Sequence, residues 1–183
     1  MKKVLIVIVI LVQAFFYHAC DNSKKPDKST VLVNESDVDD GGKAFMKAAS
    51  LSGIMEVELA KIAQQNAASP TVKEFAEMMI SDHTRIFNEL KKLATDKHIL
   101  LPIELEQEQI AQLTKLKELN GTEFDRGYMR LMVRSHEQAV KDFEAGARNR
   151  DPQVNKLASD KLETLKEHLS ESKSIFNKII VSQ

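Results

Sequence analysis

Four titratable residues occupy positions on the apolar faces of four helical segments, where packing favours a hydrophobic side chain. They are Glu56, His83, His136 and His168. Three imidazoles and a carboxylate, one from each of four helices, are suitable ligands for zinc, copper, nickel or iron. A metal site would form only if the four side chains meet, so the segments that carry them must be placed first.

The composition is typical of an all-helical protein. The chain has 183 residues, enough for one domain with a substantial core, and it contains six glycines, four prolines and no tryptophan. The formal net charge is −1, and no basic stretch interleaved with aromatic residues is present. We therefore expect an all-α fold and no binding to nucleic acid.

Helix start and stop signals divide residues 44–183, the predicted helical bundle domain, into four long segments and one short segment. Ser69-Pro70 and Asp151-Pro152 are strong start signals, and Thr122 with Asp125 resembles a capping box. The turns at Ser69 and Asp151 are short, which predicts two antiparallel hairpins joined by a crossover that contains the short helix. The predicted ranges are Ala44 to Ala67, Ser69 to Lys97, Ile103 to Leu119, Glu123 to Arg148, and a last helix that begins at Pro152.

Positions along the hairpins place the four polar residues at matching heights. Glu56 precedes the first turn by about 13 residues and His83 follows it by about 14, so the two should be level. His136 and His168 lie about 15 and 17 residues from the second turn, a difference of about 3 Å at 1.5 Å per residue. Their angular positions put both of these histidines near the margins of their apolar stripes. The vertical offset between the hairpins stays open, because the crossover length does not fix it.

Two interpretations of these residues remain open. One is a metal site formed by the three histidines and Glu56. The other is a polar core layer in which Glu56 pairs with a histidine while Ser52, Ser135 and Tyr128 complete the hydrogen bonds. Either arrangement would fix which helices pair.

Each histidine has an acidic neighbour in the sequence. These neighbours are Asp82, Glu137 and Glu167. Consecutive side chains on a helix diverge by about 100°, so we expect the three to be surface charges and not ligands.

The N-terminal residues predict export and membrane attachment. Residues 1–20 combine a short basic start with an apolar run that has the proportions of a signal peptide. Cys20, the single cysteine, follows Ala19 at the expected cleavage point, which resembles a bacterial lipoprotein signal in which the cysteine carries the lipid. An ordinary cleaved signal with an incidental cysteine is the alternative. Residues 21–43 are polar and predict a flexible tether.

The helical segments resemble a family of exported bacterial proteins within the ferritin-like superfamily, catalogued as a domain of unknown function and often described as outer-membrane proteins. The resemblance covers nearly all of the chain after the tether. It implies a ferritin-like four-helix bundle with a crossover and a location in the cell envelope, and it supplies no established activity. The matching segments are GIMEVELAKIA, VKEFAEMMISDHTRIFNELKKLA, LNGTEFDRGYMRLMVRSHEQAVKDFE and LKEHL.

A di-iron site of the ferritin type is not expected. Di-iron ferritins carry a Glu-x-x-His element on each of two helices. Here the positions three before the histidines hold Ile80, Val133 and Leu165. The absence of these carboxylates argues against ferroxidase chemistry and iron storage.

Three functions are compatible with the sequence. The first is an envelope-anchored binding or stress-associated module that holds one metal ion in its core. The second is a metal-dependent redox or hydrolytic enzyme using the same residues, which would need an open ligand position and a path for solvent. The third is a structural or interaction lipoprotein with a polar core layer. In each case the expected partner is a membrane, reached through a lipid on Cys20, and the sequence does not identify any protein partner.

Overall fold

The structure of the chain is a computed structural model, and it describes residues 37–181. The predicted signal peptide, Cys20 and most of the predicted tether lie outside the described residues. Within them, none of the helices combines the length and the apolar character that crossing a membrane requires. The helices are α1 (Asp40–Asn66), α2 (Pro70–Asp96), α3 (Gln107–Lys117), α4 (Gly121–Gly146) and α5 (Pro152–Val181).

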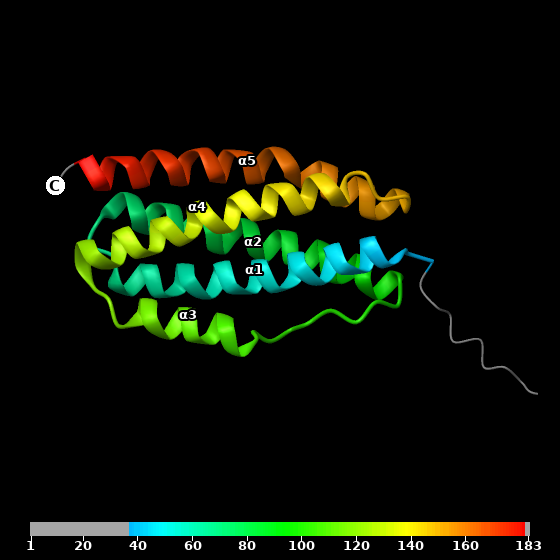
Figure 1. Cartoon of the computed structure of the whole chain (residues 1–183), viewed down its shortest axis with the longest axis horizontal. Coiled ribbons are helices and arrows are strands. Elements are labelled where there is room, and N and C mark those ends of the chain that lie inside the picture. Colours follow the sequence, from blue (N-terminus) through cyan, green and yellow to red (C-terminus); the bar gives the residue numbers. More distant parts are fainter. Residues whose placement is uncertain (1–36, 182–183) are drawn as a thin grey trace, which may run out of the picture. The chain divides into compact units, whose positions relative to one another are not determined.

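The four long helices form a bundle of two antiparallel hairpins (Figure 1). α1 packs against α2, and α4 packs against α5; further contacts join α1 to α4 and α2 to α5. The crossover between the hairpins carries α3 along α1 and α4. The predicted all-α bundle with a crossover and a short extra helix is therefore confirmed.

Side-chain caps explain where two of the long helices begin. The Asp151 carboxylate accepts hydrogen bonds from the backbone N–H groups of Gln153 and Val154, at 2.9 and 3.1 Å. At α1, the Asp39 carboxylate accepts from Gly42 N–H at 2.7 Å. This cap starts α1 at Asp40, four residues before the predicted start, so residues 40–43 of the predicted tether are helical.

The boundaries around α3 differ from the prediction. The helix begins at Gln107 because Glu106 and Gln109 form a capping box, and the residues from Ile103 to Glu106 are not helical. The predicted capping box of Thr122 and Asp125 is wrong, because α4 has Asn120 as its N-cap and no side chain caps it.

Asp125 instead holds the turn between α1 and α2. Its carboxylate accepts from Ala68 N–H at 3.1 Å and from Ser69 N–H at 2.9 Å. The carboxyl is buried, and Ser69 provides no side-chain hydrogen bond to α2 although it is the N-cap. A residue of the second hairpin therefore closes the turn of the first, and this contact helps to fix one hairpin against the other.

Replacing Asp125 with alanine is expected to lower the free energy of unfolding by about 2–3 kcal/mol, because two buried backbone N–H groups lose their acceptor. Urea denaturation followed by circular dichroism measures the change. Glu123→Gln, at an exposed position on the same turn of α4, is the matched control and should change stability by less than about 0.5 kcal/mol. An equally small effect of Asp125→Ala would show that the carboxylate does not stabilise the turn.

The crossover is fastened to α1 near both of its ends. Ser50 Oγ donates to the Pro102 carbonyl at 2.7 Å. The Asn66 side-chain amide donates to the carbonyls of Lys117 and Leu119, at 3.1 and 2.9 Å. These bonds hold α3 beside the middle of α1, the part of the bundle that carries the polar residues.

The hydrophobic core consists of two clusters, one toward each end of the bundle. On α2, for example, the first cluster ends at Met79 and the second begins at Ile86. His83 lies between these two residues, and His168 lies likewise between Leu165 and Ile175 on α5. The polar residues therefore form a layer that separates two apolar halves of the core.

Candidate metal centre

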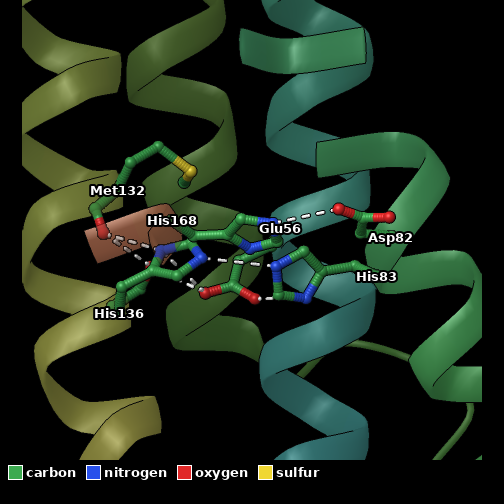
Figure 2. A network of polar contacts seen from close by, with 7 residues as sticks. Glu56, Asp82, His83, Met132, His136 and His168 are labelled. Carbon is green, nitrogen blue, oxygen red and sulfur yellow. Dashed lines mark hydrogen bonds and ion pairs between the residues drawn. The ribbon is translucent and has the colours of Figure 1, made fainter. Parts of the chain in front are cut away.

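The structure brings all four predicted residues together in the middle of the bundle (Figure 2). Each comes from a different long helix, and their side chains are almost fully buried. The predicted marginal positions of His136 and His168 are wrong, because these residues expose only 0% and 2% of their surface.

The heights predicted along the first hairpin are confirmed. Glu56 Oε2 and His83 Nδ1 lie 2.9 Å apart across α1 and α2. The offset between the hairpins, which the sequence left open, proves to be small: His83 Nε2 lies 3.3 Å from His136 Nε2. The three imidazole rings have centroids 5.3 to 5.4 Å apart.

One nitrogen of each histidine is held by a group that can only accept a hydrogen bond. His83 Nδ1 donates to the Glu56 carboxylate at 2.9 Å, and His136 Nδ1 donates to the Met132 carbonyl at 2.9 Å. His168 Nε2 donates to the Asp82 carboxylate at 3.0 Å. Because carboxylates and carbonyls have no hydrogen to give, these partners place the N–H of each neutral ring on the held nitrogen.

The second nitrogen of each ring therefore carries a lone pair when the ring is neutral. Those of His83 and His136 face each other, and His168 Nδ1 is buried without a hydrogen-bond partner among the described residues. One nitrogen from each histidine lies within 4.8 Å of the others. Three buried lone pairs at such distances repel one another unless a proton or a cation lies between them.

The spacing suits ligands of a single ion. Two nitrogen ligands of a tetrahedral ion, each about 2.0–2.1 Å from it, lie about 3.3 Å apart. The two facing nitrogens of His83 and His136 already have this separation. A hydrogen-bonded carboxylate or carbonyl behind each ring is also the usual arrangement around metal-binding histidines, because it fixes the tautomer and the ring orientation.

The surroundings shift the pKa values of Glu56 and the three histidines in different directions. Burial alone would raise the pKa of Glu56, but the charges of His83 and His136 and the hydrogen bonds from His83 and Ser135 outweigh it and lower the pKa to about 2. Burial opposes the charged form of His83, yet the adjacent Glu56 carboxylate raises its pKa overall. Burial lowers the pKa of His136, and burial together with the charges of His83 and His136 lowers that of His168 to about 4.

Asp82 also belongs to the polar layer, which the sequence did not predict. It was expected to be a surface charge, but its carboxylate binds His168 and also accepts from the Arg85 guanidinium at 2.8 Å. Its side chain is 19% exposed. Asp82 lies one residue, or about 100° of helix rotation, from His83, which turns it toward α5. Its contact with His168 could have been predicted by assuming that α2 and α5 pack antiparallel. Glu137, in contrast, pairs with Lys173 on the surface.

Of the three residues expected to complete a polar core layer, only Ser135 has a recorded hydrogen bond to Glu56. Ser135 Oγ donates to Glu56 Oε1 at 2.8 Å, as that interpretation requires. The Tyr128 hydroxyl is buried and has no hydrogen-bond partner among the residues that the structure describes. Ser52 lines a pocket between α1, α3 and α4. The side chains that hold the four central residues are therefore Ser135 and Asp82.

Residues 28–175 match the sequence profile of a domain of unknown function, DUF4142. The chain belongs to the DUF4142 family. The predicted membership of a family catalogued as a domain of unknown function is thus confirmed. A comparison of this DUF4142 chain with curated proteins found no match.

Solved structures with the same fold come from a group called DUF305 and from a protein called CopM. A DUF305 fragment from Deinococcus radiodurans has a TM-score of 0.69 at 16% identity and covers 77% of this DUF4142 chain and 98% of its own. A DUF305 protein from Streptomyces coelicolor, provisionally described as secreted, has a TM-score of 0.65 at 14% identity and covers 76% and 93%. CopM in its Cu(II)-bound form has a TM-score of 0.64 at 21% identity and covers 75% and 96%. These structural similarities show that the chain has the same helical bundle fold as these proteins.

Proposed function

We propose that this domain binds one transition-metal ion through His83, His136 and His168. The observation that carries the proposal is that each ring has one nitrogen held by a carboxylate or carbonyl and a second nitrogen turned toward the other rings. The second nitrogen of His168, Nδ1, is buried and has no hydrogen-bond partner among the described residues. In this proposal Glu56 and Asp82 orient two of the rings and do not bind the ion. The sequence suggested Glu56 as a fourth ligand, but its two carboxylate oxygens are already bound by His83 and Ser135.

Copper(II) is the ion that we expect to bind most tightly. Imidazole nitrogen suits zinc, copper, nickel and iron, and among divalent ions of the first row copper(II) generally has the highest affinity for nitrogen sites. The similarly folded CopM has been seen with Cu(II) bound, which supports the choice. Iron storage is disfavoured, because the positions three before the histidines are occupied by Ile80, Val133 and Leu165.

Metal content tests the proposal directly. The full-length protein is loaded with excess copper(II), passed through a desalting column and analysed for metal and protein. One ion per chain is expected, and the same result with zinc would show that the site accepts both. A stoichiometry near zero for copper, zinc, nickel and iron would contradict the proposal and leave the polar core layer as the role of these residues.

We further propose that the domain works in the cell envelope, held to a membrane by a lipid on Cys20. Support comes from the basic and apolar residues before Cys20 and from the relative described as secreted. Cys20→Ser should release the protein from the membrane fraction of its host, and Ser23→Ala is the matched control. Unchanged fractionation of Cys20→Ser would contradict lipidation.

Copper affinity is expected to fall as pH falls, with a slope near one proton. Because His83 Nδ1 donates to Glu56, the proton that converts this ring to the charged form sits on Nε2, where the ion would bind. Glu56 raises the pKa of His83 above 6.5, so this proton competes with copper below that pH. Burial lowers the pKa of His136, and burial with the neighbouring charges lowers that of His168 to about 4, so these rings stay unprotonated to lower pH than His83 does.

Titration calorimetry at several pH values measures this effect. Below pH 6.5 the logarithm of the dissociation constant should rise on acidification, by about one for each pH unit as long as His83 alone takes up a proton. A slope near three would mean that all three rings titrate together, and a slope of zero would mean that the ion is not bound by histidine.

A further inference from the structure

A pocket of about 890 Å³ opens between α1, α3 and α4. Glu56 and Ser135 form part of its lining. Glu56 also contacts the histidines, at 2.9 Å from His83 Nδ1 and 3.7 Å from His136 Nδ1, and Ser135 donates to Glu56. The Glu56 carboxylate therefore stands between the pocket and the imidazoles, although it exposes only 1% of its surface.

The pocket carries more negative than positive side chains. The basic residues of its lining are Arg134 and Lys141. The acidic residues are Glu56, Glu106, Glu108, Glu137 and Asp142. Glu137 pairs with Lys173, and Glu56 pairs with His83. The remaining acids, Glu106, Glu108 and Asp142, still outnumber the two basic residues of the lining. A concave surface with a net negative charge concentrates cations, so this small excess favours the approach of a metal ion.

On the side of α2 and α5, an ion pair covers the histidines. On that side Asp82 covers His168, and its carboxylate is bound by the Arg85 guanidinium. The Arg85 side chain is 63% exposed, so this ion pair lies at the surface, outside His168. An ion taking this path would have to break the contact between Asp82 and His168 that orients the ring.

We propose that metal ions enter and leave the three-histidine site through the pocket between α1, α3 and α4, with Glu56 as the last group an ion contacts before the imidazoles. This inference rests on the proposed function. Passage requires the Glu56 carboxylate to turn from His83 toward the pocket, where it meets the ion, and then to return to His83 Nδ1. Glu56 thus acts in the exchange of the ion as well as in the orientation of the ring.

An obstruction in the pocket tests the route without touching the site. Ser52 lines the pocket and has no contact with the histidines among those the structure records, so Ser52→Phe should fill part of the passage. Stopped-flow absorbance on the full-length protein gives the rate of copper(II) binding, and mixing the loaded protein with excess EDTA gives the rate of release. Both rates should fall together, by about fivefold or more, with the equilibrium dissociation constant changed less than about twofold. Thr84→Phe, at an exposed site on α2 outside the pocket, is the matched control.

A surface charge reversal provides a second test that does not disturb packing. Glu108→Lys, at an exposed site on α3, should slow copper binding by about threefold at low ionic strength, and added salt should reduce the difference. Glu163→Lys on the exposed face of α5, outside the pocket, should have a smaller effect. If the wild type binds copper but neither pocket variant changes the rates more than its control does, the route is wrong. If the wild type binds no metal, the proposed function itself fails.

Discussion

Replacing His83 with alanine should lower the affinity for copper(II) by more than about a hundredfold, because changes to residues that merely support a metal ligand already cost about 10- to 100-fold. His83 Nε2 is the nitrogen closest to another ring nitrogen of the site, at 3.3 Å from His136 Nε2. Titration calorimetry on the full-length protein at neutral pH measures the loss. The matched control is His98→Asn, at an exposed histidine just after α2, which should leave the affinity unchanged.

The same substitution should also destabilise the metal-free protein. His83 is the partner of a carboxylate that exposes 1% of its surface, and removing one member of a buried ion pair costs about 3–5 kcal/mol. His83→Gln retains an N–H donor for Glu56 and cannot supply an imidazole nitrogen, so it should be more stable than His83→Ala and equally defective in metal binding. Copper affinity of wild-type strength in a folded His83→Gln protein would show that this ring is not a ligand.

The substitution Glu56→Gln should weaken copper binding by about 10- to 100-fold while leaving the three histidines in place. The amide has the size of the carboxylate but lacks its charge, so the His83 ring becomes a weaker electron donor and its pKa should fall. The matched control is Glu58→Gln, two residues away on α1, where the side chain is 44% exposed and pairs with Lys61. A change no larger in Glu56→Gln than in Glu58→Gln would mean that the carboxylate has no part in the site.

A pH series on the metal-free protein adds an independent measure of Glu56. Its pKa is lowered from 4.5 to about 2, so its ionised form stabilises the fold fully above pH 4.5, and this stabilisation is lost as pH falls from 4.5 toward 2. The stability difference between the wild type and Glu56→Gln in urea should shrink over that range. A difference that grows on acidification would contradict the lowered pKa.

The relative heights of residues on the two helices of a hairpin could be predicted from the sequence, because a short turn fixes how the two helices are aligned. Counting residues from the first turn placed Glu56 level with His83, and the two side chains do form an ion pair. The Asp151 cap of α5 could also be predicted, because a capping residue and its helix are adjacent in the sequence. Each of these predictions depended on a local signal and a fixed rise per residue.

Contacts between the hairpins could not be predicted in this way. Asp125 looked like part of a local capping box, but it caps the other hairpin through Ala68 and Ser69, more than 50 residues away. Asp82 looked like a surface charge because its contact with His168 depends on how α5 packs against α2. The crossover length does not determine the offset between hairpins, so the meeting of His83 with His136 needed the three-dimensional structure.

Anomalous diffraction from a crystal of the copper-loaded protein, recorded at the copper absorption edge, tests the three-histidine site most directly. We expect one strong peak per chain, about 2 Å from one ring nitrogen of each of His83, His136 and His168. The nitrogens should be Nε2 of His83 and His136 and Nδ1 of His168, with Glu56 and Asp82 still bound to the other sides of their rings. A peak that lies elsewhere, on the pocket carboxylates or at His98, with none between the three imidazoles, would contradict the proposed site.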